Sequence, residues 1–282
     1  MTTVAPKPAV EASRPETRPT TLVQQSWIMV KRNLIHTKRM PEMLSDVTVQ
    51  PIMFVLLFAF VFGASIANTG GASYREFLLP GIMAQTIVFT AFVVAAGITA
   101  DVEKGIIDRF RSLPIHRSSV LIGRSVAGLL HSSIGIVVMT LTGLCIGWRI
   151  RGSAAEAVLA FALMLVFGFG MVWLGILVGS MMRSVEAVNG VMFTVLFPIT
   201  FLANTFAPTG PMPRWLRVTA EWNPVSSLAQ ATRELWGNGP VAPPEAQLPL
   251  HHPILATVLW SLVITAVLAP VALRAYARRT SD

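Results

Sequence analysis

Charged residues are scarce in this chain of 282 residues. Asp, Glu, Lys and Arg make up 13% of it, about half the share typical of soluble domains, whereas 53% of the residues are hydrophobic. The mean hydropathy is +0.62. This composition excludes an ordinary soluble domain and predicts an integral membrane protein.

Residue types that hold nucleotides or metals are also few. Cys145 is the single cysteine, so no disulfide can form within the chain, and we expect it to be a packing residue. The four lysines do not follow a glycine-rich loop of the kind that holds the phosphates of ATP. The five histidines include no pair spaced to share a metal ion. We therefore expect neither a metal site nor an ATPase activity in this chain.

Six long apolar stretches each approach the roughly 20 residues that a helix needs to cross a bilayer. They cover residues 47–67, 78–100, 126–147, 157–180, 187–206 and 254–273, and none contains Asp, Glu, Lys or Arg. Transporters driven by protons or ions usually keep ionisable groups inside the membrane. The sequence therefore predicts an all-α transmembrane domain of six spans over 47–274, and indicates that its energy comes from elsewhere.

The segments outside the spans differ in character. Residues 1–20 are rich in proline and are predicted to be a disordered tail, and 275–282 form a second short tail. Residues 21–46 are amphipathic but too charged to span, so we expect an interfacial helix with Trp27 at the headgroup level.

Lys and Arg are distributed unevenly between the two sides of these spans. With the N-terminus inside, sixteen of them fall in inside segments and six in outside segments. Both termini are therefore predicted to be cytoplasmic, in the inner (plasma) membrane of a cell. The same distribution accounts for the net charge of +8 without a nucleic-acid partner.

The only long connection, 207–253, is predicted to be external and rich in proline and tryptophan. Within it, the run between Pro224 and Gly237 reads as a short helix. Two readings stay open: a partly re-entrant cap, or a surface loop anchored by interfacial tryptophans.

The connection over 101–117 is short and highly charged. Ile106, Phe110 and Leu113 are spaced to share one face of a helix, while acids and bases take the other positions. A simple tether needs no such stripe. We expect this segment to be a cytoplasmic helix that docks on a partner, with Phe110 as its buried anchor.

Two spans carry polar and aromatic side chains at helical spacing. In the fifth they are Asn189, Phe193, Phe197, Thr200 and Asn204, and in the second Gln85 and Phe89. Such a lining suits an amphipathic ligand, because rings supply apolar contact and amides supply orientation. The alternative is that these polar groups only join neighbouring helices.

The 101–124 run resembles the coupling segment of the permease subunits of type-2 ABC exporters, in particular the actinobacterial daunorubicin-resistance subfamily. The resemblance rests on Glu103-Lys104-Gly105, on Leu113-Pro114 and on a basic return to Arg124, and it extends over nearly the whole chain. The matching positions that it implies for contact with the ATPase are Glu103, Lys104, Gly105, Ile106, Arg109, Phe110, Leu113 and Pro114.

The resemblance implies a homodimer of permeases with separate nucleotide-binding subunits, which would bind ATP and Mg²⁺, while this chain holds no cofactor. It also implies outward transport of amphipathic drugs, lipids or polysaccharides, with spans 2 and 5 near the dimer axis. Two other functions remain open: a membrane scaffold that recruits a soluble partner, and a secondary transporter with a docking helix.

Overall fold

The computed structural model describes residues 21–39, 41–62, 74–106, 117–240 and 242–279, and every regular element within these ranges is a helix. The all-α prediction is thus confirmed. In chain order the helices are α1 (Leu22–Arg39), α2 (Pro41–Leu56), the π-helical turn η1 (Leu57–Phe62), α3 (Tyr74–Val88), α4 (Thr90–Glu103), α6 (Arg117–Cys145), α7 (Ala154–Met181), α8 (Val185–Phe201), α9 (Arg214–Glu221), α10 (Pro224–Trp236), α11 (Leu248–His251) and α12 (Pro253–Arg279).

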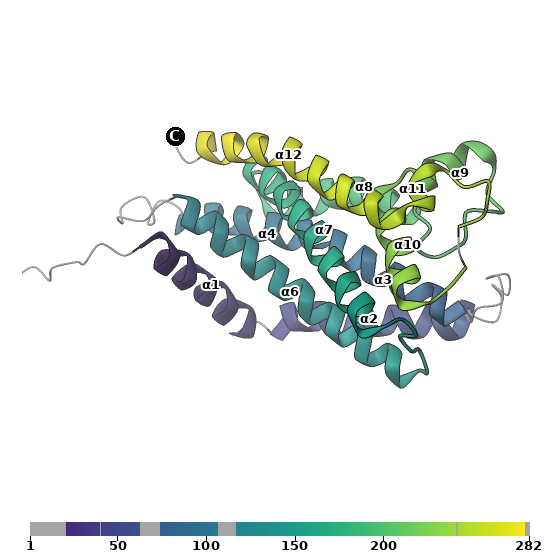
Figure 1. The fold of residues 1–282 in the computed structure, drawn as a ribbon. Helices are drawn as coiled ribbons and strands as arrows, with labels where there is room; N and C mark the ends of the chain where they lie inside the picture. The colour runs from purple at the N-terminus through teal and green to yellow at the C-terminus, as the bar shows by residue number, and fades with distance from the viewer. Residues whose placement is uncertain (1–20, 40, 63–73, 107–116, 241, 280–282) are drawn as a thin grey trace, which may run out of the picture.

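The long helices lie side by side in one bundle (Figure 1). α7 packs against both α4 and α12, and α6 packs against α1 and α2. The short helices α9, α10 and α11 gather at one end, where α10 contacts α3, α7 and α12. We call this the α10 end, and the opposite end, where α4 finishes, the Asp101 end.

Four helices are long and apolar enough to cross a membrane: Tyr74–Glu103, Ser119–Cys145, Ala154–Met181 and Pro253–Arg279. Two shorter apolar helices, Thr48–Val61 and Val185–Phe201, occupy the first and fifth predicted spans. The prediction of six spans is therefore confirmed for four of them, and the other two remain predictions. The helix of the fifth predicted span, α8, ends at Phe201 and not at residue 206, because the chain turns there toward contacts with α10.

The long helices also extend beyond the predicted spans and carry charges near their ends. Asp101 lies in the last turn of α4, and Arg124 lies within α6. The predicted tail 275–282 is likewise helical up to Arg279, whose guanidinium donates to the carbonyls of Gly179 and Ser180 at 3.2 and 3.0 Å. A helix continues past the apolar run whenever its terminal charges find partners, so hydropathy alone underestimates its length.

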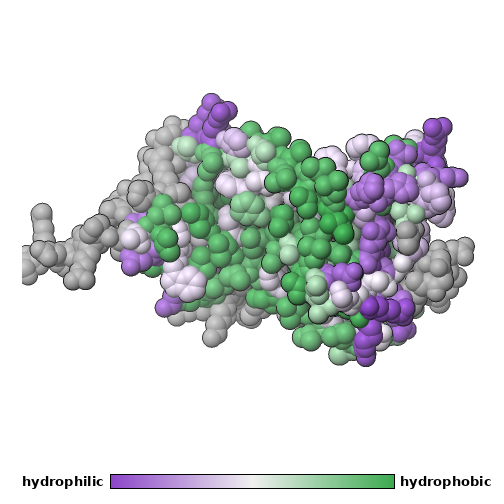
Figure 2. Space-filling view, in the orientation of Figure 1, coloured by the Kyte–Doolittle hydropathy of each residue, from purple (hydrophilic) through white to green (hydrophobic). Residues whose placement is uncertain are grey.

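The centre of the bundle is the helix pair α3–α4. In the most apolar stretch of α3–α4, 78% of the residues are buried, whereas the figure for α12 is 11%. The pair α3–α4 therefore lies in the core of the bundle, and α12 lies at its periphery. Leu78, Met83 and Ile87 are fully buried among α6, α7 and α10. Figure 2 shows the outer face: hydrophobic side chains cover its middle, and hydrophilic ones gather toward its ends. This is the surface expected of a protein whose middle lies in hydrocarbon.

Glycines allow α7 to approach α4 closely. A Cβ on Gly175 would lie 2.4 Å from the carbonyl oxygen of Ala91, and one on Gly179 would lie 2.6 Å from that of Ala95. The Gly-xxx-Gly spacing, a common motif of membrane helix packing, here joins two helices of the same chain.

A buried arginine fixes the α10 end. Arg233 is 1% exposed, and its Nε donates to the carbonyl of Phe77 at 2.9 Å and its Nη2 to that of Asn204 at 2.8 Å. Its guanidinium lies 3.7 Å from the centroid of the Phe77 ring. Desolvation by burial lowers the pKa of Arg233 to about 9, so the group stays charged at neutral pH. The carbonyls and the ring together stabilise that charge.

The helix predicted between Pro224 and Gly237 is α10. Its first turn is capped by Asn223, whose side chain accepts from the Val225 N–H at 2.9 Å, and Pro224 follows in the position that tolerates proline. Gly237 ends the helix in the left-handed conformation, with φ at 63°. α10 is almost wholly buried against the bundle, so this part of 207–253 is a packed cap, whereas Trp215 and Trp222 are 71% and 48% exposed.

The first helix, α1, has apolar side chains on two different sides. Val30 is buried against the bundle, whereas Val23 and Trp27 are 75% and 65% exposed. Two apolar surfaces therefore exist, one packed on α6 and one available to lipid, which agrees with an interfacial position for α1. The predicted tail 1–20 lies outside the described residues.

We predict that Gly175→Ala destabilises the protein, because the added methyl group meets backbone atoms of α4 and the two helices must separate. Overpacking of this kind costs about 1–3 kcal/mol. Gly190→Ala is the matched control, because it also lies within a helix but nothing stands within 4 Å of its Cβ position. The apparent melting temperature in detergent should fall for the first variant only. Equal melting temperatures would disprove the close α4–α7 contact.

Candidate functional site

A cavity of about 560 Å³ opens within the bundle and is enclosed by α1, α2, α3, α4, α6 and α8. This volume lies in the range of about 300–1,000 Å³ that sites for drug-sized ligands occupy. It runs from aromatic walls in the middle of the bundle to charged residues at the Asp101 end. The cavity thus has an apolar part and a charged part.

Phenylalanines form much of the apolar wall. Phe92 of α4 and Phe193 of α8 meet edge to face with their centroids 5.8 Å apart, and Phe197 stacks on Phe201 at 4.1 Å. Phe193 and Phe197 are 53% and 46% exposed, so much of each ring is free to contact a ligand, lipid or a second protein.

The predicted path residues divide into two groups. Gln85, Phe89, Phe193 and Phe197 line the cavity. Gln85 is 7% exposed, and its amide donates to the Thr200 hydroxyl at 3.4 Å. Thr200 itself donates to the carbonyl of Leu196 and lies behind the wall, so it positions Gln85 instead of lining the cavity.

Asn189 and Asn204 are not brought to the cavity. Asn189 is exposed on α8, outside the lining. Asn204 follows the end of α8, and its backbone N–H donates to Ser226 of α10 at 2.9 Å while its carbonyl accepts from Arg233. The predicted spacing assumed a helix that continues to residue 206. Asn204 does not share the face of Phe193 and Phe197, because α8 ends at Phe201.

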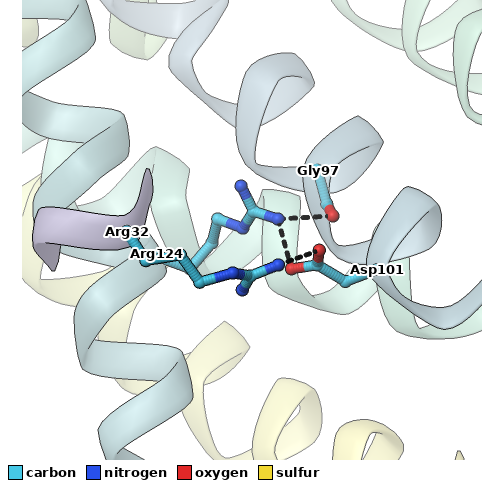
Figure 3. Close-up of polar contacts among 4 residues, drawn as sticks. All are labelled: Arg32, Gly97, Asp101 and Arg124. Carbon is cyan, nitrogen blue, oxygen red and sulfur yellow. Dashed lines mark hydrogen bonds and ion pairs between the residues drawn. The ribbon is translucent and has the colours of Figure 1, made fainter. Parts of the chain in front are cut away.

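The charged end centres on Asp101, which joins three helices (Figure 3). One carboxylate oxygen accepts from Arg32 of α1 at 2.8 Å, and the other accepts from Arg124 of α6 at 2.6 Å. Arg124 also donates to the carbonyl of Gly97 at 2.6 Å. The side chains of Asp101 and Arg124 are only 13% and 17% exposed, so this pairing is largely desolvated. We call these four residues the Asp101 clasp.

Glycine at position 97 makes the clasp possible. A Cβ there would lie 2.6 Å from the guanidinium carbon of Arg124, so any other residue would displace that arginine. Composition and spacing did not predict the pairing of Arg32 and Arg124 with Asp101. An acid at the end of an apolar helix was the one available signal, but spacing could not identify partners on two other helices.

Four of the eight predicted coupling residues lie in the described part of the chain. Glu103 ends α4, the Lys104 N–H bonds back to the Ala100 carbonyl at 3.1 Å, and Gly105 takes the left-handed conformation with φ at 62°. The start of the segment predicted as a helix over 101–117 is therefore the end of α4 followed by a turn. Lys104 and Ile106 also line the cavity. The other four, Arg109, Phe110, Leu113 and Pro114, lie outside the described residues.

We predict that Asp101→Asn destabilises the protein by roughly 3 kcal/mol, since it leaves two guanidiniums, one of them largely buried, without their carboxylate. A spin label at Trp27→Cys, in a Cys145→Ala background, should also become more mobile as α1 loses its link to α4. Glu245→Gln is the control, because Glu245 is 82% exposed and 3.6 Å from Arg217, a surface pair of little energetic value. An unchanged melting temperature and unchanged label mobility would show that the clasp is not structural.

Comparison with known proteins identifies the family. The model of the ABC-2 type transporter family matches residues 24–235. The chain is 31% identical over 215 residues to the daunorubicin resistance ABC transporter permease protein DrrB1 of Streptomyces coeruleorubidus, covering 76% of each chain. It is 23% identical over 249 residues to a probable doxorubicin resistance ABC transporter permease, DrrC, of Mycobacterium tuberculosis, covering 88% of this chain and 86% of that one. A putative transport permease, ycf38, of Cyanophora paradoxa is 27% identical over 224 residues, covering 77% of this chain and 75% of that one.

The matched region begins in α1 and ends in α10, so it includes every helix that encloses the cavity. Family and architecture agree, since apolar helices long enough to span a membrane form the bundle. This chain is a multi-pass membrane protein and belongs to the ABC-2 type transporter family as a permease, the membrane subunit and not the ATPase.

Proposed function

We propose that this chain is the transmembrane permease subunit of an ATP-driven exporter that moves an amphipathic drug, lipid or polysaccharide outward. The observation that carries the proposal is the cavity, because its aromatic walls and charged end are matched to a molecule with an apolar body and a polar group. The relatives named for resistance to daunorubicin and doxorubicin support a role in export.

The energy for transport would come from a separate nucleotide-binding subunit that binds ATP and Mg²⁺. We propose that it docks on the segment that begins at Glu103 and contains Phe110. The first residues of this segment support the assignment, because Lys104 and Ile106 line the cavity next to the Asp101 clasp. A displacement of the docked segment would then reach the cavity through a single turn of chain.

We further propose that the permease is a homodimer in the plasma membrane with both termini cytoplasmic, which places the Asp101 end on the cytoplasmic side. The excess of Lys and Arg in the segments assigned inside supports this orientation. The exposed phenylalanines of α8 support a second copy as a neighbour, because Phe193, Phe197 and Phe201 are 53%, 46% and 40% exposed.

A secondary transporter is the second candidate, and one observation favours it. Asp101, Arg124 and His131 all line the cavity, so ionisable groups do reach the interior of the bundle. Asp101 and Arg124 lie outside the six predicted spans, but they belong to the helices α4 and α6, which extend beyond those spans. A scaffold without transport would have no use for the cavity.

Transport in sealed vesicles tests the proposal. Vesicles containing the permease and its partner ATPase should accumulate a fluorescent amphipathic substrate only when ATP is present. Uptake should persist when a protonophore is added at constant ATP, because no proton gradient is consumed. A partner with its catalytic glutamate replaced by glutamine is the matched control, and should reduce uptake to background.

Two outcomes would contradict the exporter. Substrate movement driven by a pH gradient alone, without the partner, would establish a secondary transporter. A stable complex with a soluble protein, combined with no transport under either driving force, would favour a scaffold.

We also predict that Phe110→Ala weakens binding of the ATPase subunit. Truncating a buried aromatic anchor typically costs about 2 kcal/mol or more, which corresponds to roughly thirtyfold in affinity. The measurement is co-purification and titration of the two subunits in detergent. Leu248→Ala is the control, because Leu248 is 71% exposed at the α10 end, far along the chain from the docking segment. Unchanged affinity together with unchanged transport would rule out Phe110 as the anchor.

A further inference from the structure

One uncharged polar side chain of the cavity wall is held in a definite orientation. Gln85 of α3 lines the cavity and is only 7% exposed, so protein surrounds most of its amide. Its Nε2 donates to the hydroxyl of Thr200 on α8 at 3.4 Å. An amide has donors at one end and an acceptor at the other. The end that faces the cavity therefore decides which ligands this side chain can bind.

The Thr200 hydroxyl can only accept a hydrogen bond from this amide. Its single hydrogen is directed at its own helix, because the oxygen lies 2.9 Å from the Leu196 carbonyl and 3.1 Å from the Phe197 carbonyl. Threonines in helices commonly bond back to the preceding turn in this way. Only lone pairs remain toward Gln85, so the amide must present its NH₂ group there. A half-turn of the amide would place two acceptors against each other.

The other end of the amide, the Gln85 Oε1 atom, is left for the cavity. Within the described part of the chain no group donates to this oxygen, although the atom keeps some accessible surface. Thr86 also lines the cavity, and its hydroxyl donates to the Ile82 carbonyl at 3.0 Å, so its oxygen likewise offers lone pairs. Two neighbouring residues of α3 thus bring acceptors to the same part of the wall.

Aromatic rings lie close to these acceptors. The Phe89 N–H bonds back to the Gln85 carbonyl at 3.2 Å, and Phe197 lies one turn before Thr200; the side chains of both phenylalanines line the cavity. An apolar ligand between the rings would take water away from the Gln85 oxygen. An acceptor that loses water without gaining a donor is costly. A ligand that carries its own donor avoids this cost.

We propose that Gln85 determines specificity in this cavity: its Oε1 atom accepts a hydrogen bond from a hydroxyl or N–H group of the transported amphiphile, and Thr200 is the positioning residue that fixes the amide. The inference rests on the proposed function in treating the cavity as the substrate site, and it adds the polar group that a substrate must carry. A molecule of the same shape with only ether oxygens would set an acceptor against an acceptor, and is disfavoured.

Two probes that differ by one hydrogen-bond donor, pyrenebutanol and its methyl ether, test the proposal. The full chain is placed in phosphatidylcholine nanodiscs without ATP or the partner, because this headgroup carries no donor. Saturable energy transfer from the tryptophans to pyrene measures binding, and partition into protein-free vesicles of the same lipid corrects for the probe concentration in the bilayer. The alcohol should bind roughly tenfold more tightly, since the ether leaves the Gln85 oxygen unpaired.

Variants assign the preference to the amide and its orientation. Gln85→Leu should weaken the alcohol about tenfold without weakening the ether, because only the alcohol loses a hydrogen bond. Thr200→Val nearly keeps the side-chain shape but removes the oxygen that accepts from Gln85, so the amide can turn its NH₂ group to the cavity. The ether should then bind more tightly than to the unaltered protein, which a loss of structure would not cause. Thr200→Ser keeps the hydroxyl and should retain the preference.

Thr194→Val is the matched control. Thr194 lies on the same helix as Thr200 and donates to the Gly190 carbonyl at 2.8 Å, but it does not line the cavity. This variant should leave the affinities of both probes unchanged. Melting temperatures in nanodiscs check that the variants fold, and Thr200→Val decides the question if Gln85→Leu does not.

Several results would overturn the proposal. Equal affinities of the two probes for the unaltered protein would show that no donor is required, and a preference that survives Gln85→Leu would belong to another residue. An unchanged preference in Thr200→Val would show that Thr200 does not orient the amide. No saturable binding of either probe would remove the site itself. The exporter proposal is tested separately, because ATP-dependent uptake of two probes that bind equally well would contradict only the donor requirement.

Discussion

The helix pair α3–α4 is buried in its middle and is bound by arginines of other helices at both of its ends. At the α10 end the Phe77 carbonyl is bound by Arg233, and at the Asp101 end the carboxylate is bound by two arginines. A buried charge without partners costs several kcal/mol, so neither end can slide along its neighbours without losing a defined interaction. The positions of α1, α6, α8 and α10 all follow from these two attachments and from the glycine-mediated contact with α7.

The two attachments differ in kind, and the difference bears on motion. Arg233 has no carboxylate partner among the described residues and depends on backbone carbonyls and one aromatic ring, all of which belong to fixed parts of the fold. The Asp101 clasp is made of side chains on three separate helices, and it borders an open cavity. Side-chain ion pairs can exchange partners without breaking a helix. If the bundle rearranges during transport, we expect the change at the Asp101 end and not at the α10 end.

Local signals allowed much of the fold to be predicted. Hydropathy located the long apolar helices, and the run bounded by Pro224 and Gly237 predicted α10 almost to the residue. Four residues expected from helical spacing line the cavity: Gln85, Phe193 and Phe197 lie within helices, and Phe89 lies in the turn that joins α3 to α4. The prediction failed where a distant contact decides the outcome. Asn204 leaves the helix because its carbonyl is bound by Arg233, and Asp101 finds its partners 69 residues before it and 23 residues after it in the chain.

These features connect the cavity to its proposed source of energy over a very short path. Asp101, Lys104 and Ile106 all line the cavity, yet they belong to the last turn of α4 and to the turn that follows it. Gly105 lies between them in a left-handed conformation, so the chain changes direction there instead of continuing as one rigid rod. A force on the following segment would consequently act on the cavity's charged end first, and the buried middle of α4, held against α7 by Gly175 and Gly179, would resist it. We therefore expect the contacts that hold the core together to confine movement to the charged end of the cavity.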